Sequence, residues 1–246
     1  MNRLWTFGDS AVERNIRLRP DMPQHETWTE ILAKKLNFKL SDHSWGASSL
    51  AFTYYHYRQQ LDNFKKGDVV IIGLTDLIRG WFVEKTPNMS TAHRVRSASF
   101  IPDSYKDFVD TYFDEYFRED VELNILHNFL DMLVYHQESK GIKVVAFSTE
   151  KYTYDRVKMP KELTGAIGVL WQDAAMGEVI EGEDEFGKVF YNIQYGNRTD
   201  TRLNHVSEPN HSIWAEKMFD SIHTGQPMDF TTGFLKNIMN INELIQ

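Results

Sequence analysis

The stretch Val69-Val70-Ile71-Ile72-Gly73-Leu74 decides the fold, because an unbroken apolar run of this length, rich in β-branched residues, is typical of a strand buried on both faces. Ile142–Phe147 is a second, near-continuous run rich in β-branched residues, and Leu4–Phe7 is a shorter strand-like segment. Strands buried on both faces occur in parallel sheets that helices cover on each side. These three segments therefore predict the centre of a parallel sheet.

Helical patterns alternate with the predicted strands. Apolar residues recur at helical spacing on one helix face at Trp28, Ile31, Leu32 and Leu36, and on another at Leu126, Phe129, Leu130, Leu133 and Val134. A weaker strand is predicted at Phe38–His43, and Val189–Tyr195 is either a late strand or an irregular excursion. Alternation of this kind specifies right-handed crossovers between parallel strands. The expected fold class is α/β, a three-layer α/β/α sandwich with a mostly parallel central sheet, in a single domain over residues 1–246.

Two stretches, at about 80–118 and 152–197, exceed what a minimal sandwich needs, and we interpret them as insertions. The first is rich in aromatic residues. Both follow strands at the edge of the sheet where α/β proteins bind ligands. The insertions form either the walls of a substrate cleft or helical additions whose aromatic side chains pack on the body of the domain.

The composition excludes several classes of protein. The chain has no cysteine, which excludes disulfides, thiolate metal sites and a cysteine nucleophile. The formal net charge of -8 argues against a broad nucleic-acid surface. No apolar run approaches the roughly 20 residues of a membrane span, and the N-terminus does not resemble a signal peptide. We therefore expect a soluble, cytoplasmic protein that acts on a neutral or sugar-like substrate.

Gly8-Asp9-Ser10 follows the first predicted strand directly. In an open α/β sheet this position lies at the carboxyl edge, where ligands bind. The turn that follows directs free backbone N–H groups toward the same point, as a developing oxyanion requires. Ser10 is therefore the candidate nucleophile, although the same tripeptide also occurs in turns that only cap a helix.

Four blocks of sequence, in order, resemble the motifs of the GDSL/SGNH hydrolase family. Trp5–Ser10 resembles its nucleophile block, Trp45–Ser49 its glycine block, Val70–Arg79 its Gly-x-Asn block, and Asn204–Ala215 its histidine block with the final helix. The resemblance spans nearly the whole chain and is closest to divergent bacterial and phage members. It implies the SGNH three-layer fold and a serine hydrolase that requires no metal or other cofactor.

The resemblance also implies an oxyanion hole. Gly46 matches the glycine whose backbone N–H contributes to it, beside the N–H of Ser10. Thr75 stands where asparagine is usual, with Arg79 four residues later. A threonine hydroxyl still donates one hydrogen bond, so Thr75 is predicted to bind the oxyanion. Asp76 is placed with the substrate-binding residues, although an ionised carboxylate cannot donate to an oxyanion.

The fourth block carries two histidines. In the family the catalytic histidine is followed by a small cap residue and a final helix, which implies His205 as the general base. The local sequence agrees, because Ser207 is a favourable N-cap and Pro209 suits the first turn of a helix. His211 is the alternative base, since it lies three residues after Glu208.

The position of the family's triad acid, three residues before the histidine, is occupied by Arg202. Asp200 is the nearest carboxylate upstream and is the candidate acid of a Ser-His-Asp triad. The alternative is a dyad of Ser10 and His205 in which a backbone carbonyl orients the imidazole. We predict the dyad.

The function that follows is hydrolysis of an ester through an acyl-enzyme on Ser10, with an O-acetyl group on a carbohydrate as one candidate substrate. The rival hypothesis is a degenerate SGNH-fold module that binds a carbohydrate or a protein without catalysis. No metal site is expected, because the spacing of His205, Glu208 and His211 fits no zinc pattern. The expected partner is a small-molecule or glycan ester, with no nucleic acid and no membrane, and the oligomeric state is left open.

Overall fold

The structure is a computed structural model, and it describes residues 1–9, 11–12, 26–46, 48–77, 79, 111–170, 180–183, 189–192 and 208–235. The central strands are β1 (Arg3–Phe7), β2 (Lys39–Asp42), β3 (Val69–Leu74) and β4 (Lys143–Ser148). They form a parallel sheet in the order β2-β1-β3-β4. All four lie where the sequence predicts strands, and the α/β fold class is confirmed.

Burial on both faces explains why the central segments form strands. Every residue of β3 is buried, and its side chains alternate between two apolar cores. Ile71 lies in one core and Ile72 in the other. The register pairs Ile71 with Thr6 of β1 and with Val145 of β4. The carboxyl ends of the strands therefore lie at one common edge of the sheet.

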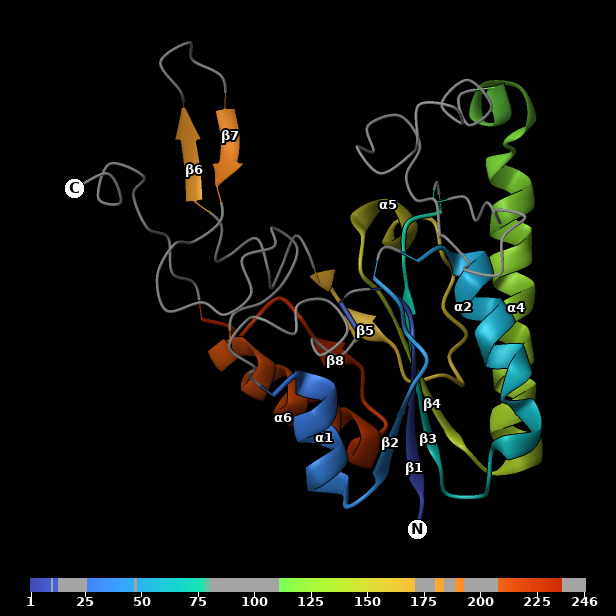
Figure 1. The fold of residues 1–246 in the computed structure, drawn as a ribbon, viewed down its shortest axis with the longest axis vertical. Coiled ribbons are helices and arrows are strands. Elements are labelled where there is room, and N and C mark those ends of the chain that lie inside the picture. Colours follow the sequence, from blue (N-terminus) through green and yellow to red (C-terminus); the bar gives the residue numbers. More distant parts are fainter. Residues whose placement is uncertain are drawn as a thin grey trace, which may run out of the picture.

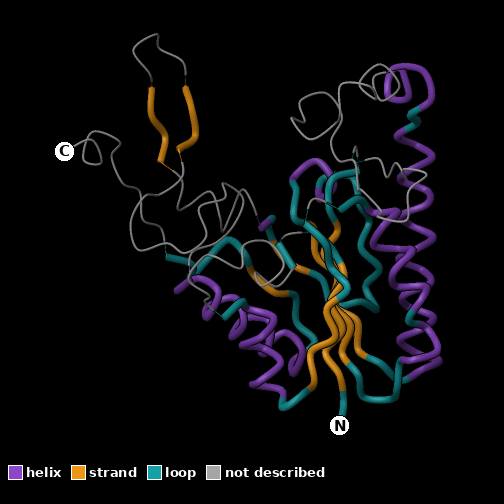
Figure 2. The backbone as a smooth tube through the Cα atoms, in the orientation of Figure 1, coloured by secondary structure: helices purple, strands orange, loops and turns teal. Residues whose placement is uncertain are grey.

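Helices cover both faces of the sheet and complete the three layers (Figure 1). Helices α1 (Trp28–Leu36) and α6 (Glu208–Thr224) pack together on one face. Helices α2 (Leu50–Gln59) and α4 (Glu119–Lys140) lie on the other face, and the backbone view separates the two helical layers from the strands between them (Figure 2). The arrangement is the predicted α/β/α sandwich.

Local sequence signals define the ends of α1. The carboxylate of Glu30 accepts a hydrogen bond from the Thr27 backbone N–H at 3.1 Å, which satisfies a donor at the start of the helix. The helix ends at Asn37, whose φ of 55° lies in the left-handed region that asparagine tolerates. The chain then turns directly into β2.

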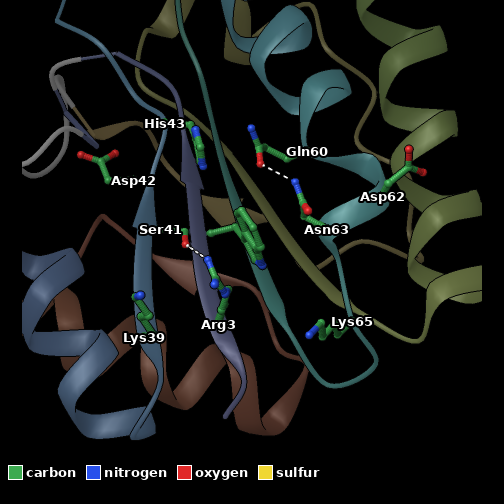
Figure 3. Close-up of a pocket in the computed structure, with 10 residues that line it drawn as sticks. Arg3, Lys39, Ser41, Asp42, His43, Gln60, Asp62, Asn63 and Lys65 are labelled. Carbon is green, nitrogen blue, oxygen red and sulfur yellow. Dashed lines mark hydrogen bonds between the residues drawn. The ribbon is translucent and has the colours of Figure 1, made fainter.

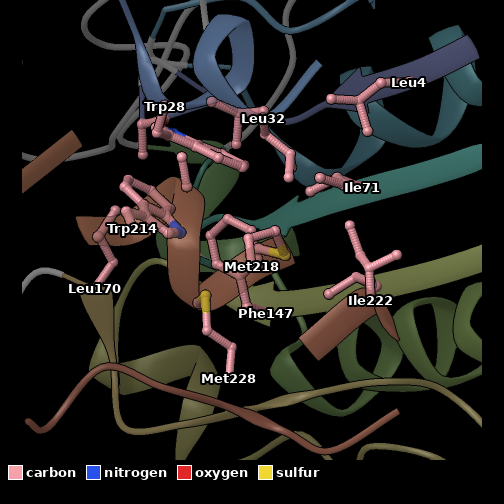
Figure 4. Close-up of a cluster of buried hydrophobic side chains, with 14 of the residues drawn as sticks. Leu4, Trp28, Leu32, Ile71, Phe147, Leu170, Trp214, Met218, Ile222 and Met228 are labelled. Atoms are coloured by element: carbon pink, nitrogen blue, oxygen red, sulfur yellow. The ribbon is translucent and has the colours of Figure 1, made fainter. Parts of the chain in front are cut away.

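The core between the sheet and the α1–α6 layer is built around aromatic rings (Figure 4). Trp28 of α1 stacks on Trp214 of α6 with ring centroids 4.2 Å apart, and Phe147 of β4 meets Trp214 edge-on at 5.6 Å. Full burial of one large apolar side chain stabilises a fold by roughly 1.5–3 kcal/mol. These contacts therefore fix the position of α6, which carries His211, relative to the sheet.

Shorter elements complete the described part of the chain. They are the 3-10 turn η2 (Leu61–Asn63), the π-helical turn η3 (Tyr112–Tyr116), α5 (Lys151–Tyr154), β5 (Ala166–Ile167), β6 (Ile180–Glu183), β7 (Val189–Asn192) and β8 (Met228–Asp229). β5 pairs with β8 in parallel, and β6 pairs with β7 in an antiparallel hairpin. For Val189–Tyr195 the sequence left a strand or an irregular excursion open, and β7 shows that its first four residues form a strand.

The two predicted insertions are described only in part. Residues 80–110 of the first and most of 171–197 in the second lie outside the described residues. In the second, Leu163 is buried in the core beneath α4, and Val157 and Met159 pack against that core. The described start of this segment therefore packs on the body of the domain. Among the helices that the structure describes, none combines the length and the apolar character needed to cross a membrane.

Candidate active site

The carboxyl end of β1 leads into Asp9, a buried residue that is 1% exposed. One carboxylate oxygen, Oδ1, accepts a hydrogen bond from the backbone N–H of Ala11 at 3.0 Å. The other, Oδ2, accepts from the Thr75 hydroxyl at 3.0 Å and from the Arg79 guanidinium at 2.8 Å. Asp9 is therefore held from its own turn and from the segment after β3, directly before the candidate nucleophile Ser10.

Arg79 extends this network to a third strand. Its second terminal nitrogen lies 3.4 Å from Oε1 of Glu150, which follows β4. The side chains of Arg79, Asp9 and Glu150 are all at most 7% exposed. Ions removed from water in this way need close partners, so the guanidinium between two carboxylates ties the ends of β1, β3 and β4 together. We call these three residues the Asp9–Arg79–Glu150 network.

The second sequence block, Trp45–Ser49, lies at the same edge of the sheet. The backbone N–H of Trp45 and the hydroxyl of Ser48 both donate to the carbonyl oxygen of Gly8, at 2.9 and 2.8 Å. Gly46 lies in the turn between them. Among the described residues, no acceptor is bonded to the Gly46 N–H. The turn thus brings Gly46 beside the chain that leads to Ser10.

Two glycines permit the close approach of β1 and β3 at this edge. Gly8 has a φ of 151°, and a Cβ there would lie 2.9 Å from Val12 Cγ2 and 3.1 Å from the Gly73 carbonyl oxygen. A Cβ at Gly73 would lie 2.6 Å from the same Val12 methyl group. The turn after β1 therefore folds tightly over β3, which only residues without a side chain allow.

Thr75 is fully buried, and its single hydroxyl proton points to Asp9. Its carbonyl oxygen accepts from the Thr153 hydroxyl at 3.0 Å, so its backbone is fixed as well. The sequence predicts that this hydroxyl binds an oxyanion, whereas here it serves the carboxylate that precedes Ser10. Asp76 is also buried, and its backbone carbonyl accepts from the Arg79 N–H at 3.2 Å.

His211 has a structural contact in the first turn of α6. Its Nδ1 lies 3.2 Å from the backbone nitrogen of Trp28, which is always a donor, so Nδ1 is the acceptor. A neutral imidazole that accepts at Nδ1 carries its proton on Nε2. The Trp28 indole N–H in turn donates to the Ala11 carbonyl at 2.9 Å. His211 thus supports the turn after Asp9, and its lone pair is already engaged.

Of the residues that the sequence predicts for the site, the structure brings Gly46, Thr75 and Asp76 to one edge of the sheet. Ser10, His205 and Asp200 lie outside the described residues, and so does Arg202. Among the residues that are described, no group of histidine and carboxylate side chains is arranged to hold a metal ion.

Sequence reasoning missed Asp9 and Glu150 as parts of the site and noted Arg79 only as a member of the third block. The signal for Asp9 and Arg79 was their place within the blocks, one before Ser10 and four after Thr75. Glu150 had no such signal, since it is separated from Arg79 by about 70 residues and meets it only in the folded chain.

No protein-family model and no curated protein matches the chain. Among solved structures, it is similar to protein YXIM from Bacillus subtilis, with a TM-score of 0.31 and 15% sequence identity over 60% of this chain. The chain spans 33% of the length of that protein. A similarity of this size assigns neither a family nor a function.

Proposed function

We propose that this chain is a serine hydrolase that cleaves an ester, with Ser10 as the nucleophile and His205 as the general base. The observation that carries the proposal is the anchoring of Asp9 by Thr75 and Arg79. Asp9 directly precedes Ser10 at the carboxyl edge of the sheet, where α/β proteins place reacting groups. Because Asp9 is buried and hydrogen-bonded, it restrains the backbone of the neighbouring Ser10, and a nucleophile needs such a fixed position.

The reaction follows the usual course of serine hydrolases. His205 removes the proton of the Ser10 hydroxyl as its oxygen attacks the acyl carbon of the ester. The bond from that carbon to the alcohol oxygen breaks, and the alcohol leaves with the proton held by His205. Water, activated by the same imidazole, then attacks the acyl-enzyme and releases the acid. An O-acetylated carbohydrate is the substrate class that we favour.

The oxyanion of the tetrahedral intermediate is assigned to the backbone N–H groups of Gly46 and Ser10. Support for Gly46 comes from its turn, which is hydrogen-bonded to Gly8 through Trp45. We assign Thr75 a positioning role, because its hydroxyl proton is directed at Asp9. Backbone donors that are fixed before the reaction need no reorganisation as charge develops, and one such donor contributes about 10²–10³ in rate.

The contacts of His211 support His205 as the base. A general base needs an unprotonated ring nitrogen that faces the nucleophile. In His211 the nitrogen that accepts is occupied by the Trp28 N–H at 3.2 Å. Of the two histidines in the fourth block, His205 is therefore the one we assign to catalysis.

A second candidate function is a module of the same fold that binds a carbohydrate or a protein without turnover. Two features favour it: the hydroxyl of Thr75 is turned to Asp9 instead of serving as an oxyanion donor, and Arg202 occupies the position of the acid. In this case the Asp9–Arg79–Glu150 network only stabilises the fold.

Covalent labelling separates the two functions. The protein is incubated with a fluorophosphonate and, in parallel, with p-nitrophenyl acetate, and the labelled residue is located by mass spectrometry. We expect one adduct on Ser10, ester turnover above background, and loss of both in Ser10→Ala with an unchanged melting temperature. Wild-type protein that hydrolyses no ester and carries no adduct on Ser10 rejects the hydrolase and favours the binding module.

A further inference from the structure

A groove of about 550 Å³ lies beside β2, at the edge of the sheet, on the face that carries α2 and α4 (Figure 3). Strands β1 and β2 form its floor, and η2 with the following loop forms a wall. Three of its lining residues are cations, namely Arg3, Lys39 and Lys65. We call this feature the edge groove. Its lining does not include the residues of the Asp9–Arg79–Glu150 network.

The strand register explains why polar side chains gather there. Arg3 pairs with Lys39 and Trp5 pairs with Ser41 across the parallel strands. Because side chains alternate between the faces of a sheet, these four residues and His43 share the face that lines the groove. Among the strands that the structure describes, β2 is the outermost on its side of the sheet.

Arg3 is held in position but is not neutralised. Its Nη1 donates to the Ser41 hydroxyl at 3.0 Å, and its guanidinium lies 5.2 Å from the centre of the Trp5 ring. The buried carboxylate of Asp68 accepts from the Arg3 backbone N–H at 2.9 Å and from the Trp5 indole N–H at 2.8 Å. No carboxylate in the described part of the chain forms an ion pair with the guanidinium, so its charge is available to a ligand.

Lys39 and Lys65 add charge from the two sides of the groove. Both are exposed, and neither forms an ion pair with any carboxylate of the described residues. Figure 3 shows Arg3 between them in that view. An ammonium group on a flexible stem adapts to a ligand, whereas the fixed guanidinium sets its orientation through several donors in one plane.

The two acids that line the edge groove do not cancel this charge. Asp42 turns to the opposite side, where its Oδ1 accepts from the Thr6 hydroxyl at 3.0 Å and from the Ser44 N–H at 3.0 Å. Asp62 is exposed, and it points away from Arg3 in Figure 3. The whole chain carries a formal charge of -8, so a groove lined by three cations differs from the general field of the protein.

The wall opposite the strands offers neutral donors and acceptors. The carboxamides of Gln60 and Asn63 are hydrogen-bonded to each other at 3.0 Å and line the wall opposite the strands. The imidazole of His43 lies parallel to the Trp5 ring at 5.7 Å and to the Phe7 ring at 5.3 Å. The donors and acceptors of the two carboxamides match the hydroxyl groups of a polyol or a sugar.

We propose that the edge groove binds a small ligand that carries an oxyanion group, of which a sugar phosphate is the preferred form. The phosphate pairs with Arg3, Lys39 and Lys65, and the neutral part of the ligand lies along the carboxamides of Gln60 and Asn63. A phosphate monoester is favoured over a carboxylate because three cations match its double charge better than a single one. The proposal does not depend on the hydrolase function.

Isothermal titration calorimetry of the full chain tests the proposal with glucose 6-phosphate, inorganic phosphate, galacturonate and glucose as probes. We expect saturable binding of glucose 6-phosphate with Kd at or below about 1 mM, weaker binding of galacturonate, and no binding of glucose. Binding should weaken as salt is added, because exposed charges are screened over about 10 Å at 0.1 M. If glucose 6-phosphate binds more tightly than inorganic phosphate, the ligand of the edge groove is a sugar phosphate. If the two bind equally, the ligand is the free phosphate ion.

The matched variants are Lys39→Gln with Lys65→Gln, and Lys66→Gln alone. Lys66 is exposed and adjacent to Lys65, but it does not line the groove. The double variant should weaken glucose 6-phosphate binding at least about 10-fold, and Lys66→Gln should leave it within about 2-fold. Three outcomes would overturn the proposal. They are no saturable binding of any anion up to about 10 mM, binding of glucose as tight as that of glucose 6-phosphate, and a weakening by Lys66→Gln equal to that of the double variant. Ser10→Ala should bind as wild type, which separates this result from the fate of the hydrolase.

Discussion

The Arg79 guanidinium lies 2.8 Å from Oδ2 of Asp9, and the two side chains are only 7% and 2% exposed. The pair joins the segment after β3 to the turn after β1. A buried pair is weak evidence for stability as such, because both ions lose their hydration. Loss of Arg79 would leave the buried Asp9 carboxylate without this cation, directly before the candidate nucleophile.

Arg79→Met should therefore destabilise the fold strongly. The change leaves the buried carboxylates of Asp9 and Glu150 without their cation, and loss of one partner of a buried pair costs about 3–5 kcal/mol. Urea unfolding followed by circular dichroism measures the difference. Arg156→Gln is the control, because its partner Glu119 is exposed and such pairs contribute at most about 1 kcal/mol. Equal losses in the two variants would contradict the buried pair as the cause.

Thr75→Val should lower turnover by about 10²-fold or less, as expected for a positioning residue, while the protein stays folded. Valine keeps the shape of threonine but removes the proton that Asp9 receives at 3.0 Å. Thr75→Ser retains the hydroxyl and should keep most of the activity. Kinetics on p-nitrophenyl acetate measure the change, and an unchanged rate in Thr75→Val removes the Thr75 hydroxyl from the site.

Gly73→Ala should destabilise the protein by about 1–3 kcal/mol, because its Cβ would lie 2.6 Å from Val12 Cγ2. The next nearest atoms to that Cβ are 3.8 Å away, so Val12→Ala should relieve most of the clash in the double variant. Gly8→Ala has a second close contact at 3.1 Å from the Gly73 carbonyl oxygen, and Val12→Ala should rescue it less. A double-mutant cycle of unfolding free energies compares the two, and equal rescue would refute this assignment of the contacts.

Stability should fall on mild acidification because of His136. Its Nδ1 lies 2.9 Å from the buried Tyr57 hydroxyl, and burial, followed by the charges of Lys140 and Arg58, lowers its pKa in the folded protein. The unfolded chain then binds the proton more readily, so the contribution is complete above the ordinary pKa of 6.5 and decreases as the pH falls toward the lowered value.

Urea unfolding across this pH window measures the effect. Wild type should lose more stability between neutral pH and pH 5.5 than His136→Asn, which does not titrate. Parallel pH profiles of the two proteins would exclude His136 as the source.

Asp200→Asn tests the dyad, which is our prediction. If the imidazole of His205 is oriented by a backbone carbonyl, the change should cost little turnover, whereas a triad acid would cost up to about 10⁴-fold. Ser10→Ala sets the scale for complete loss. A loss in Asp200→Asn that approaches that of Ser10→Ala rejects the dyad.

The elements that the sequence predicts best are those with one strong periodic signal. β3 is predicted to the residue at Val69–Leu74, and α6 begins at Glu208, directly after the predicted N-cap Ser207. An unbroken apolar run and a helix start signal each depend on residues that are close in sequence, so the local sequence is enough to predict these two elements. Gly46 and Thr75 also lie at the predicted edge, because each follows its own predicted strand.

By itself, the sequence determined the layer order and the edge of the sheet where the candidate site lies, since strand burial and crossover handedness follow from local pattern and chirality. Only the tertiary structure decided that the Thr75 proton serves Asp9, that Glu150 completes the network, and that His211 is engaged by Trp28. Each of these is a contact between residues far apart in the chain. A hydrogen bond depends on distances of about 3 Å, and no local pattern specifies such a distance across separate elements.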